Sequence, residues 1–480
     1  MTVFAFTYQA KIPAKEAFAS DSAYMQSENL ALNAVCDSKK LTDGKTETSF
    51  QSLKKENFYV TIDLGKIEKI NSVILKEKGL NVKEFFLSVS TNGETYSTVY
   101  QNDKIEYHRL CTFDDIEARY VRLTVTKADS FPAIREIEVY HEPACNTDNF
   151  RVTAYLAAED VNTILYDESL NDKQKEVKIN QYFDDFDMTN LTHFYHYCGV
   201  VFDETGTVYL GGKDVNQEER IEQQKMLPGI IRERLSTDAK INFVFGFSQG
   251  HEGRNSAMKE NRDMFINNLI YVAKTLGFDG IDIDYEFPQT KEDFQIFSDF
   301  LVALKKAMRT QMGEDSILSC AFGTRDLNFT REAIRSLDMV NIMTYDIMDQ
   351  DGQHSSFWSC TQQAIAYAEE VGFERSQINL GIPFYGTQTE AIMEQYIYKN
   401  LPRTDYFQNT YTVNCYFDSS PTAVYFNSPA LVRDKTAFAL LNGCGIMVWS
   451  FTCDTAATEE NSLWKAVNDA VSQFGGDQNA

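Results

Sequence analysis

Three carboxyl groups alternate within one short segment, where residues 279–286 read Asp-Gly-Ile-Asp-Ile-Asp-Tyr-Glu. Successive side chains of an extended strand point to opposite faces, so we expect Asp282, Asp284 and Glu286 to line one face. Such a row costs stability, because neighbouring like charges resist joint ionisation. A set of carboxyls that shares protons can, however, keep one member protonated near neutral pH. That member could then act as a general acid.

Two other interpretations of this segment stay open. A calcium loop also alternates Asp residues, but it needs Gly and polar residues at its turn rather than Ile and Tyr. A chance cluster is compatible with an acidic chain, although solvated acidic runs are rarely interleaved with apolar residues. We therefore favour a catalytic strand over a metal site or a coincidence.

The composition is that of a globular protein with an acidic surface. The chain has 480 residues, of which 43% are hydrophobic and 24% charged, and its formal net charge is −25. This length suits two or three domains. The negative charge repels phosphate backbones, so nucleic acid is not expected as a partner and a neutral ligand fits better.

Nine cysteines occur without a Cys-x-x-Cys pair, so the sequence predicts neither a zinc site nor a disulfide scaffold. No stretch approaches 18 apolar residues, and no transmembrane helix is expected. The segment Ala17-Phe18-Ala19 resembles a signal cleavage site, but the residues before it lack a basic start and an apolar core. Either a signal is truncated by a misplaced start or the protein is not exported by this route. We favour the first, which predicts a secreted or extracytoplasmic protein.

Short alternating runs in the first third of the chain predict an antiparallel β-sandwich. We expect a disordered leader over 1–22, the sandwich over 23–142 and a linker over 143–148. Turn signals such as Asn92-Gly93 separate the runs, and no helical period persists between them. The clearest candidate strands are Phe58–Ile62, Ser72–Leu75, Glu84–Ser90, Arg119–Val125 and Arg135–Tyr140.

From residue 149 to about 475, apolar strands alternate with helical stretches, of which Asn261–Leu276 and Lys291–Met312 are the clearest. Eight such units predict a closed (β/α)8 barrel. Catalytic groups of this fold lie at the C-terminal ends of strands, where we expect Glu286. The candidate strands are Phe150–Leu156, Leu191–Phe202, Lys240–Ser248, Gly280–Glu286, Ser316–Gly323, Met339–Tyr345, Ile378–Tyr385 and Gly445–Phe451.

The barrel segment resembles glycoside hydrolase family 18, the chitinases and endo-β-N-acetylglucosaminidases. The family signature Asp-x-x-Asp-x-Asp-x-Glu is complete from Asp279 to Glu286. Four further motifs follow the family's order along about 300 residues. They are Leu191-Thr192-His193, Met343-Thr344-Tyr345-Asp346, Gly381-Ile382-Pro383-Phe384-Tyr385-Gly386 and Met447-Val448-Trp449-Ser450.

The resemblance implies substrate-assisted hydrolysis with retention and no catalytic cofactor. Glu286 would protonate the glycosidic oxygen, and the 2-acetamido oxygen of the substrate would attack the anomeric carbon. Asp284 would orient the acetamido N–H, while Asp282 would share a proton with Asp284. Tyr345 would hydrogen-bond the acetamido carbonyl, and Trp449 would form the floor under the sugar.

Six further residues receive weaker assignments. Asp279 is expected to support the strand rather than to contact sugar. The other five are candidates for lining the groove, and a purely structural role is equally compatible with each. These five are Tyr155, Met343, Asp346, Trp358 and Tyr385.

Two departures from the family pattern affect the expected groove. The third strand ends in Gly246-Phe247-Ser248-Gln249-Gly250 instead of the usual Ser-x-Gly-Gly. The segment Gln388–Asn427 is shorter than the insertion that deepens the cleft of many chitinases. A shallower cleft would favour internal cutting or bulkier glycans, whereas Met-x-Tyr-Asp at the sixth strand favours chitin-like oligomers.

The N-terminal segment resembles the coagulation factor 5/8 type C, or discoidin, domain, which bacteria use as a carbohydrate-binding module. This likeness implies a jelly-roll sandwich but does not identify its ligand. It allows a structural calcium near Asp43, although nothing in the sequence requires one. The likeness rests on Asn29-Leu30-Ala31, Leu41-Thr42-Asp43-Gly44, Ile62-Asp63-Leu64-Gly65, Ser90-Thr91-Asn92-Gly93 and Arg119-Tyr120-Val121-Arg122.

The function that the sequence predicts is a secreted retaining glycosidase acting on β-1,4-linked N-acetylglucosamine in chitin or chito-oligosaccharides. An endo-β-N-acetylglucosaminidase acting on glycoprotein N-glycans is the alternative within the same class. A catalytically silent lectin is the alternative of a different class. Intact Glu286, Asp284 and Tyr345 argue against the lectin.

Overall fold

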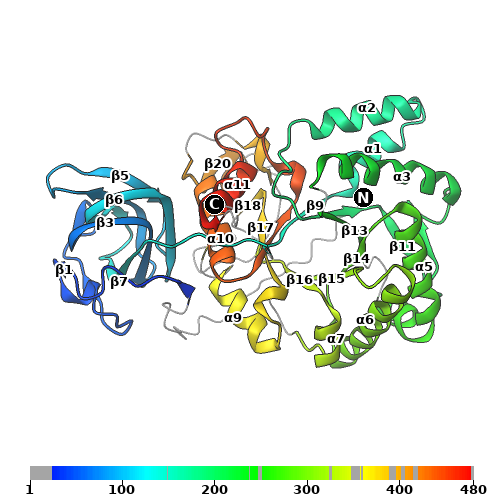
Figure 1. Ribbon diagram of the computed structural model, residues 1–480, viewed down its shortest axis with the longest axis horizontal. Helices are drawn as coiled ribbons and strands as arrows, with labels where there is room; N and C mark the ends of the chain where they lie inside the picture. The colour runs from blue at the N-terminus through cyan, green and yellow to red at the C-terminus, as the bar shows by residue number, and fades with distance from the viewer. Residues whose placement is uncertain are drawn as a thin grey trace.

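The computed structural model describes residues 24–148, 150–236, 238–246, 251–323, 327–346, 357, 361–388, 396–401, 406–414 and 420–476. Within these residues an antiparallel sheet domain precedes a closed barrel of eight parallel strands. Figure 1 shows the sheet domain at one end of the long axis and the barrel at the other. The predicted fold class is confirmed. The expected leader over 1–22 lies outside the described residues, and the domain boundaries stay predictions.

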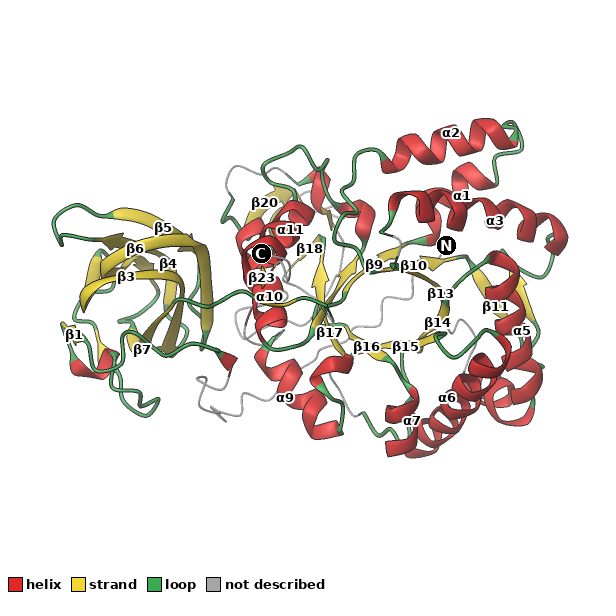
Figure 2. Cartoon of the chain, in the orientation of Figure 1, coloured by secondary structure: helices red, strands yellow, loops and turns green. Residues whose placement is uncertain are grey.

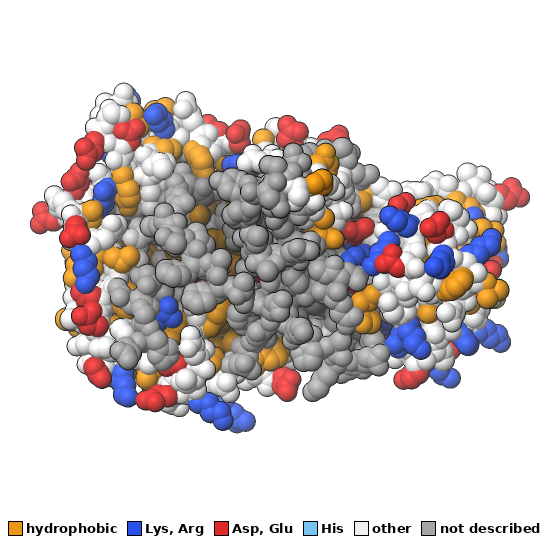
Figure 3. Space-filling view, turned by 180° about the vertical axis from the view of Figure 1, so that it is seen from behind, with side chains coloured by type: hydrophobic (Ala, Val, Ile, Leu, Met, Phe, Trp, Pro, Cys, Tyr) orange, Lys and Arg blue, Asp and Glu red, His pale blue; other side chains and the backbone are white. Residues whose placement is uncertain are grey.

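The N-terminal domain is a seven-stranded antiparallel sheet that folds over its own core. Its main path runs in the order β2-β7-β3-β6-β4-β5, and β1 pairs with β3. Seen from behind, its surface carries acidic and basic side chains interspersed with hydrophobic ones (Figure 3). The strands are β1 (Val35–Cys36), β2 (Phe50–Gln51), β3 (Phe58–Lys78), β4 (Val82–Ser90), β5 (Ser97–Asn102), β6 (Arg109–Ala128) and β7 (Ala133–Tyr140).

The sequence analysis split one long strand of this sheet into two predicted strands. The runs Phe58–Ile62 and Ser72–Leu75 belong to one strand of 21 residues, β3. Its partner β6 is similarly long, and the pairing shifts register between Asp63 and Glu68. Such irregularities bend a strand sharply. The backbone of β3 stays extended through this bend. The two predicted runs therefore belong to one continuous strand, although they lie on different parts of the sheet.

The barrel closes in the order β10-β13-β14-β15-β16-β17-β22-β9. Figure 2 shows helices packed around the outside of these strands. Each strand begins within three residues of its predicted start. The strands are β9 (Val152–Leu156), β10 (His193–Tyr197), β13 (Lys240–Gly246), β14 (Gly280–Asp284), β15 (Ile317–Phe322), β16 (Met339–Ile342), β17 (Ile378–Pro383) and β22 (Gly445–Trp449).

Most of the predicted barrel strands were too long, and three of them matter for the connections and the site. Leu191–Phe202 contains β10 and then β11 (Val200–Phe202), which leaves the barrel to pair with β12 (Val208–Leu210). The barrel strand β17 ends at Pro383, and the next strand starts at Tyr385. Most relevant to the site, β14 ends at Asp284, where its pairing with β15 stops. Glu286 therefore lies in the segment after the strand rather than on its face.

The helices cover the barrel, and the two clearest sequence predictions are confirmed. Asn261–Leu276 corresponds to α5 and Lys291–Met312 to α6. The described helices are α1 (Ala158–Leu165), α2 (Asp172–Phe183), α3 (Gln217–Arg234), α4 (His251–Asn255), α5 (Arg262–Leu276), α6 (Lys291–Gln311), α7 (Arg331–Ser336), α9 (Gln362–Val371), α10 (Pro429–Leu441) and α11 (Leu463–Phe474).

The chain between the last two barrel strands builds a small antiparallel sheet, which we call the insertion sheet. Its strand order is β19-β18-β21-β20. It contains more than half of the described residues of Gln388–Asn427, the segment that we expected to be shorter than the cleft-deepening insertion of many chitinases. Its strands are β18 (Tyr385–Gln388), β19 (Tyr396–Ile397), β20 (Thr410–Asn414) and β21 (Pro421–Tyr425).

The predicted linker 143–148 also contains ordered backbone pairing. Its strand β8 (Cys145–Asn146) lies parallel to β23 (Gly475–Gly476), the last strand of the described chain. The start and the end of the barrel region are thus joined through backbone pairing. Among the residues that the structure describes, no helix has the length and apolar character needed to span a membrane.

Candidate functional site

Asp282 lies inside the barrel and is the most deeply buried of the signature carboxyls, with 0% exposure. Its Oδ2 accepts a hydrogen bond from the Tyr155 hydroxyl at 2.7 Å, and its Oδ1 accepts one from Ser319 Oγ at 2.5 Å. Asn341 Nδ2 donates to the same Oδ1 at 3.3 Å and to the Tyr155 hydroxyl at 2.8 Å. Burial raises the pKa of Asp282 to about 7, although these donors oppose the shift.

Asp284 is the last residue of β14 and lies nearer the barrel mouth. Its Oδ2 accepts a hydrogen bond from the hydroxyl of Tyr197, which ends β10. Burial raises the pKa of Asp284, while the hydrogen bond from Tyr197 lowers it. Burial and the charge of Asp284 likewise keep the Tyr197 hydroxyl protonated, since both raise its pKa well above the ordinary value. Tyr197 therefore serves Asp284 as a stable donor.

Glu286 follows the strand end and is exposed to solvent. Its carboxyl nevertheless interacts with that of Asp284, and Tyr345 and Asp346 lie within electrostatic range. The negative charge of Asp284 is the main cause that raises the pKa of Glu286, ahead of desolvation and of the carboxyl–carboxyl interaction. A neighbouring anion opposes ionisation of the Glu286 carboxyl, so this carboxyl stays protonated to a higher pH. Because it is exposed, it can donate its proton to a bound ligand.

The segment that carries Glu286 is tied down where α6 begins. The carboxyl of Asp293 accepts hydrogen bonds from the backbone N–H groups of Gln289 and Thr290, at 3.1 and 2.8 Å. Asn255, which ends α4, donates to the other oxygen of Asp293 at 3.0 Å. Asp293 is 1% exposed. A buried capping box thus fixes the chain only a few residues after Glu286.

Aromatic and sulfur-containing side chains surround the carboxyls. Trp449, at the end of β22, is partly exposed, and its ring lies 5.7 Å from the Tyr155 ring and 5.8 Å from the Tyr197 ring. These side chains belong to a cluster that is distinct from the main barrel core. Its buried members are Tyr155, Tyr195, Val244, Met339, Tyr345, Tyr385 and Met447, and Tyr197, Ile317, Met343 and Trp449 are partly buried against it.

Tyr345, Asp346 and Tyr385 form the opposite side of the site. The hydroxyl of Tyr385 donates to Asp346 Oδ1 at 2.9 Å, and the Tyr345 ring lies 6.1 Å from that of Tyr385. Gly381 makes room for this arrangement, because a Cβ there would lie 2.8 Å from Cε1 of the Tyr345 ring. A larger residue at 381 would therefore displace Tyr345.

The structure brings most of the predicted site residues together. The exception is Asp279, at the other end of β14, whose Oδ2 accepts from the Ile241 N–H at 2.8 Å and from Arg232 Nη2 at 2.9 Å. Asp279 thus contacts the start of the neighbouring strand β13, and its supporting role stays a prediction. Trp358 and the segment from Phe247 to Gly250 lie outside the described residues.

Sequence reasoning missed three residues that contact Asp282 or Asp284: Tyr197, Ser319 and Asn341. It also missed Arg232, which contacts Asp279. A signal for Tyr197 was present, because the aromatic residues 195 and 197 alternate along β10 and must share one face. Ser319 and Asn341 are single polar residues in apolar strands, at positions whose side chains point into the barrel. Nothing in the sequence shows which carboxyl they contact.

A second carboxyl pair lies in the N-terminal sheet domain. Burial raises the pKa of Glu136 to about 8, and a hydrogen bond with Asp43 adds to the shift. Thr48 Oγ1 donates to Asp43 Oδ1 at 3.1 Å, and the Lys45 N–H donates to both carboxyls at 3.0 Å. Two carboxyls and a hydroxyl are oxygen groups of the chemical type that calcium prefers as ligands. Among the described residues no group of three or more His, Cys, Asp or Glu side chains could hold a metal ion.

Two family models match this chain. The model of glycosyl hydrolases family 18 matches residues 174–454, and the F5/8 type C domain model matches residues 19–138. The first match covers more than half of the chain and includes all of the barrel strands from β10 to β22. Both resemblances predicted from the sequence motifs are confirmed.

Curated relatives match parts of the barrel. The chain is 33% identical over 99 residues to Nod factor hydrolase protein 1 of Medicago truncatula, which is 18% of this chain and 26% of that protein. It is 24% identical over 254 residues to class V chitinase CHIT5b of the same plant, which is 42% of this chain and 67% of that protein. These likenesses span only part of each relative.

A solved chitinase from Bacteroides thetaiotaomicron has the same barrel fold. The match has a TM-score of 0.50 at 19% identity and covers 69% of this chain and 99% of that chain. At this identity the likeness establishes the fold alone.

Proposed function

The chain belongs to glycosyl hydrolases family 18, and we propose that it is a retaining glycosidase that hydrolyses β-1,4-linked N-acetylglucosamine in chitin or chito-oligosaccharides. The observation that carries this proposal is the exposed Glu286, whose pKa is raised by the charge of Asp284. Tyr345 and Trp449 lie in the same cluster of side chains. A proton donor beside an anion and an aromatic surface suits a neutral sugar substrate.

The first step of the proposed reaction is proton transfer. Protonated Glu286 donates its proton to the glycosidic oxygen as the bond to the anomeric carbon breaks. The acetamido oxygen of the substrate attacks that carbon and forms a cyclic oxazolinium ion. The leaving sugar departs with the proton, and Glu286 becomes a carboxylate that can activate water for the second step. Two inversions at the anomeric carbon give net retention.

Asp284 supplies the electrostatic stabilisation in this scheme. Its carboxylate orients the acetamido N–H and offsets the positive charge of the oxazolinium ion, mainly in the transition state. The Tyr197 hydroxyl fixes one oxygen of Asp284 and leaves Oδ1 for the substrate. Asp282 lies deeper in the barrel and shares a proton with Asp284. Tyr155 and Ser319 hold the Asp282 carboxyl in place through hydrogen bonds.

Product analysis tests the proposal and its same-class alternative. We expect chitotetraose to be cleaved to products that are initially β-anomers by proton NMR, and a high-mannose glycopeptide to remain intact. Cleavage of the glycopeptide alone would instead support an endo-β-N-acetylglucosaminidase acting on N-glycans. Binding of chitotetraose without cleavage would support the lectin. Initial α-anomers would contradict the retaining mechanism.

We further propose that the N-terminal sheet domain holds a structural calcium ion between Asp43 and Glu136. Burial is the main cause that raises the pKa of Glu136, and the hydrogen bond with Asp43 adds to the shift. A divalent cation between the two carboxyls would favour their ionised forms. Secretion remains our proposal for the location of the protein. N-terminal sequencing of protein recovered from culture medium would test it, and finding the protein only inside cells would contradict it.

A further inference from the structure

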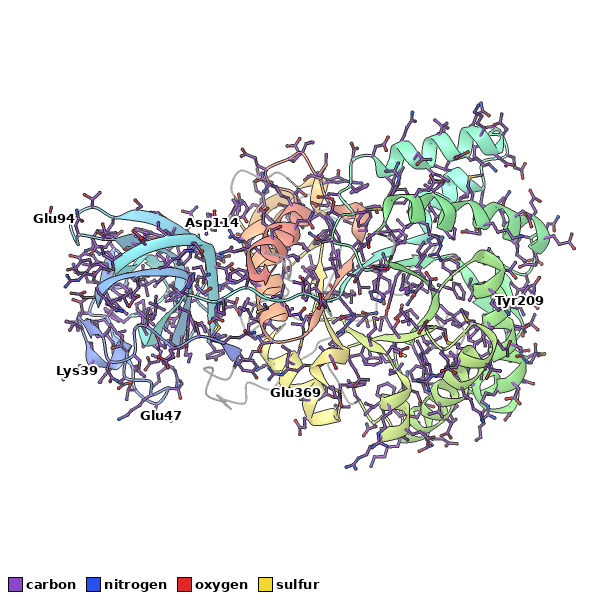
Figure 4. All side chains as sticks on the ribbon, viewed as in Figure 1. Lys39, Glu47, Glu94, Asp114, Tyr209 and Glu369 are labelled. Atoms are coloured by element: carbon purple, nitrogen blue, oxygen red, sulfur yellow. The ribbon has the colours of Figure 1, made fainter. Side chains whose placement is uncertain are left out.

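The N-terminal sheet domain packs end-on against the helix α10 of the barrel. Asp434 of α10 is 0% exposed, and its partners come from the sheet domain. The Tyr100 hydroxyl donates to Asp434 Oδ2 at 2.6 Å, and the N–H and Oγ1 of Thr112 donate to Oδ1 at 2.9 and 2.6 Å. Figure 4 labels Asp114 at this junction, where it forms a 2.7 Å ion pair with Arg433.

The buried carboxyl of Asp434 opposes separation of the two domains. Burial raises the pKa of Asp434 to about 6, and the hydrogen bonds from Thr112 and Tyr100 oppose that shift. If the domains separated, these donors and the acceptor would each need new partners. Removing one member of such a buried network is costly because the remaining polar group stays unpaired. The junction therefore differs from the exposed linker of a mobile binding module.

A second contact reaches the insertion sheet. Asn409, which is 1% exposed, lies just before β20. Its Nδ2 donates to Asn102 Oδ1 at 2.9 Å and to Asp103 Oδ1 at 3.1 Å, both in the sheet domain. Phe407 packs its ring 5.4 Å from that of Tyr100. Asn409 is thus the point where the sheet domain holds the insertion sheet.

A series of contacts among the described residues connects Asn409 with the active site. The N–H of Phe426 donates to the Asn409 carbonyl at 2.9 Å, directly after β21. β21 pairs with β18, in which Thr387 faces Tyr425. β18 begins with Tyr385, whose hydroxyl holds Asp346. The charge of Asp346 in turn acts on Glu286.

A third contact between the sheet domain and the barrel domain involves Phe357. The backbone N–H of Phe357 donates to Glu106 Oε1 at 3.2 Å, and the guanidinium of Arg109 lies 5.8 Å from the Phe357 ring. The same ring lies 5.6 Å from that of Phe438 in α10. The sheet domain therefore contacts the barrel domain at Phe357 as well as at Asp434 and Asn409.

We propose that the sheet domain is a fixed positioning domain for the Tyr385–Asp346 side of the active site, and that Asn409 is the positioning residue that transmits its effect. This role is separate from any ligand that the domain binds. A tethered sugar-binding module would raise activity only on polymers that it can hold. A positioning domain changes turnover of every substrate, including the smallest.

The test uses the full chain and an aryl chitobioside, which is too short to be held by the sheet domain and the cleft together. Asn409→Asp keeps the shape of the side chain, but it loses two N–H donations and places a negative charge beside Asp103. We expect kcat to fall about 10-fold with KM changed less than about 2-fold. We also expect the basic limb of kcat/KM to shift to lower pH, because Asp346 would act less on Glu286.

Adding Asp103→Asn to Asn409→Asp restores a donor opposite the new carboxylate, and we expect it to recover most of kcat. Asp114→Ala is the matched control, since it removes an ion pair at the same junction whose Asp side chain is 93% exposed. We expect that control to behave as wild type. A fall in melting temperature for Asn409→Asp with unchanged kcat, KM and pH profile would overturn the proposal.

The positioning role of the sheet domain does not depend on which reaction the barrel catalyses, because glycosidase activity serves here only to detect changes at the active site. Hydrogen–deuterium exchange of residues 385–388 tests it independently, because loss of the Asn409 contact should speed amide exchange in β18. Unchanged exchange there would overturn the positioning role even if the wild type were active. An inactive wild type with faster exchange in Asn409→Asp would instead contradict the proposed function and support the positioning role.

Discussion

Among the described residues, an aspartate and a glutamate interact both in the barrel, where Asp284 is paired with Glu286, and in the sheet domain, where Asp43 is paired with Glu136. In each pair the pKa of the glutamate is raised, and the neighbouring aspartate contributes to the shift. The pairs differ in what surrounds them. Glu286 is exposed beside a cluster of tyrosines and a tryptophan, whereas Glu136 is 1% exposed.

The difference shows that a raised glutamate pKa does not by itself indicate catalysis. The pKa of Asp43 is lowered, because hydrogen bonds from Glu136, Lys45 and Thr48 outweigh its burial. Glu136 of that pair is closed off from solvent, and both carboxyls accept from the Lys45 N–H. The barrel pair has an exposed proton donor and an aromatic surface. Access to solvent and the surrounding side chains therefore distinguish the candidate proton donor from the buried pair.

The largest effect should come from the exposed glutamate. Glu286→Gln keeps the shape of the side chain but cannot transfer a proton, so we expect kcat on chitotetraose to fall about 10³-fold. Affinity for chitotetraose, measured by titration calorimetry, should change less than about 3-fold. Glu136→Gln is the matched variant in the other pair, and it should keep near wild-type kcat. Equal losses in the two variants would remove the distinction between the pairs.

The neighbouring aspartate sets the protonation of the donor. Asp284→Asn removes the charge that raises the pKa of Glu286, so this pKa should fall. Because the active form of Glu286 is the protonated one, activity is lost as pH rises through its pKa. The basic limb of kcat/KM should therefore move to lower pH, and kcat at the optimum should fall roughly 100-fold. A basic limb at its wild-type position would show that another group sets it.

Tyr197 should matter less, because it acts through Asp284. Tyr197→Phe removes one hydrogen bond to the carboxylate, and we expect kcat to fall about 10-fold with little change in KM. The exposed Tyr271 provides a control, since Tyr271→Phe should leave both constants unchanged. If Tyr197→Phe raised KM as strongly as it lowered kcat, Tyr197 would bind substrate directly.

The smallest effect on activity is expected in the sheet-domain pair. Calcium should raise the melting temperature of the wild-type protein by roughly 2–4 °C, as expected when a ligand binds only the folded state. Glu136→Gln should abolish this rise while kcat changes less than about 2-fold. Magnesium serves as the comparison ion and should act more weakly, because it binds all-protein oxygen sites less readily. No response to calcium in the wild type would contradict the site.

The alternating runs of the first third and the strand–helix repeats of the rest were sufficient to predict both folds, and they placed Asp282 and Asp284 on one strand. They did not place Glu286, which follows β14 instead of lying on its face. Strand boundaries were less accurate, as β3 and β14 show. A bulged strand has no distinct composition at its bend, so β3 was expected as two strands. The end of β14 depends on where the pairing with β15 stops, which is a property of the neighbouring strand.

The amino-acid types and spacing of Asp282, Asp284 and Glu286 are local, so the candidate catalytic carboxyls could be identified without a structure. The partners of these carboxyls depend on the three-dimensional fold. Tyr197 and Ser319 come from strands that are 87 and 37 residues away from the aspartates they contact. The contact between Asn409 and Asn102 spans 307 residues and joins two domains. The physical reason is that strand periodicity fixes which face a side chain occupies, whereas barrel closure and domain docking fix what lies opposite that face.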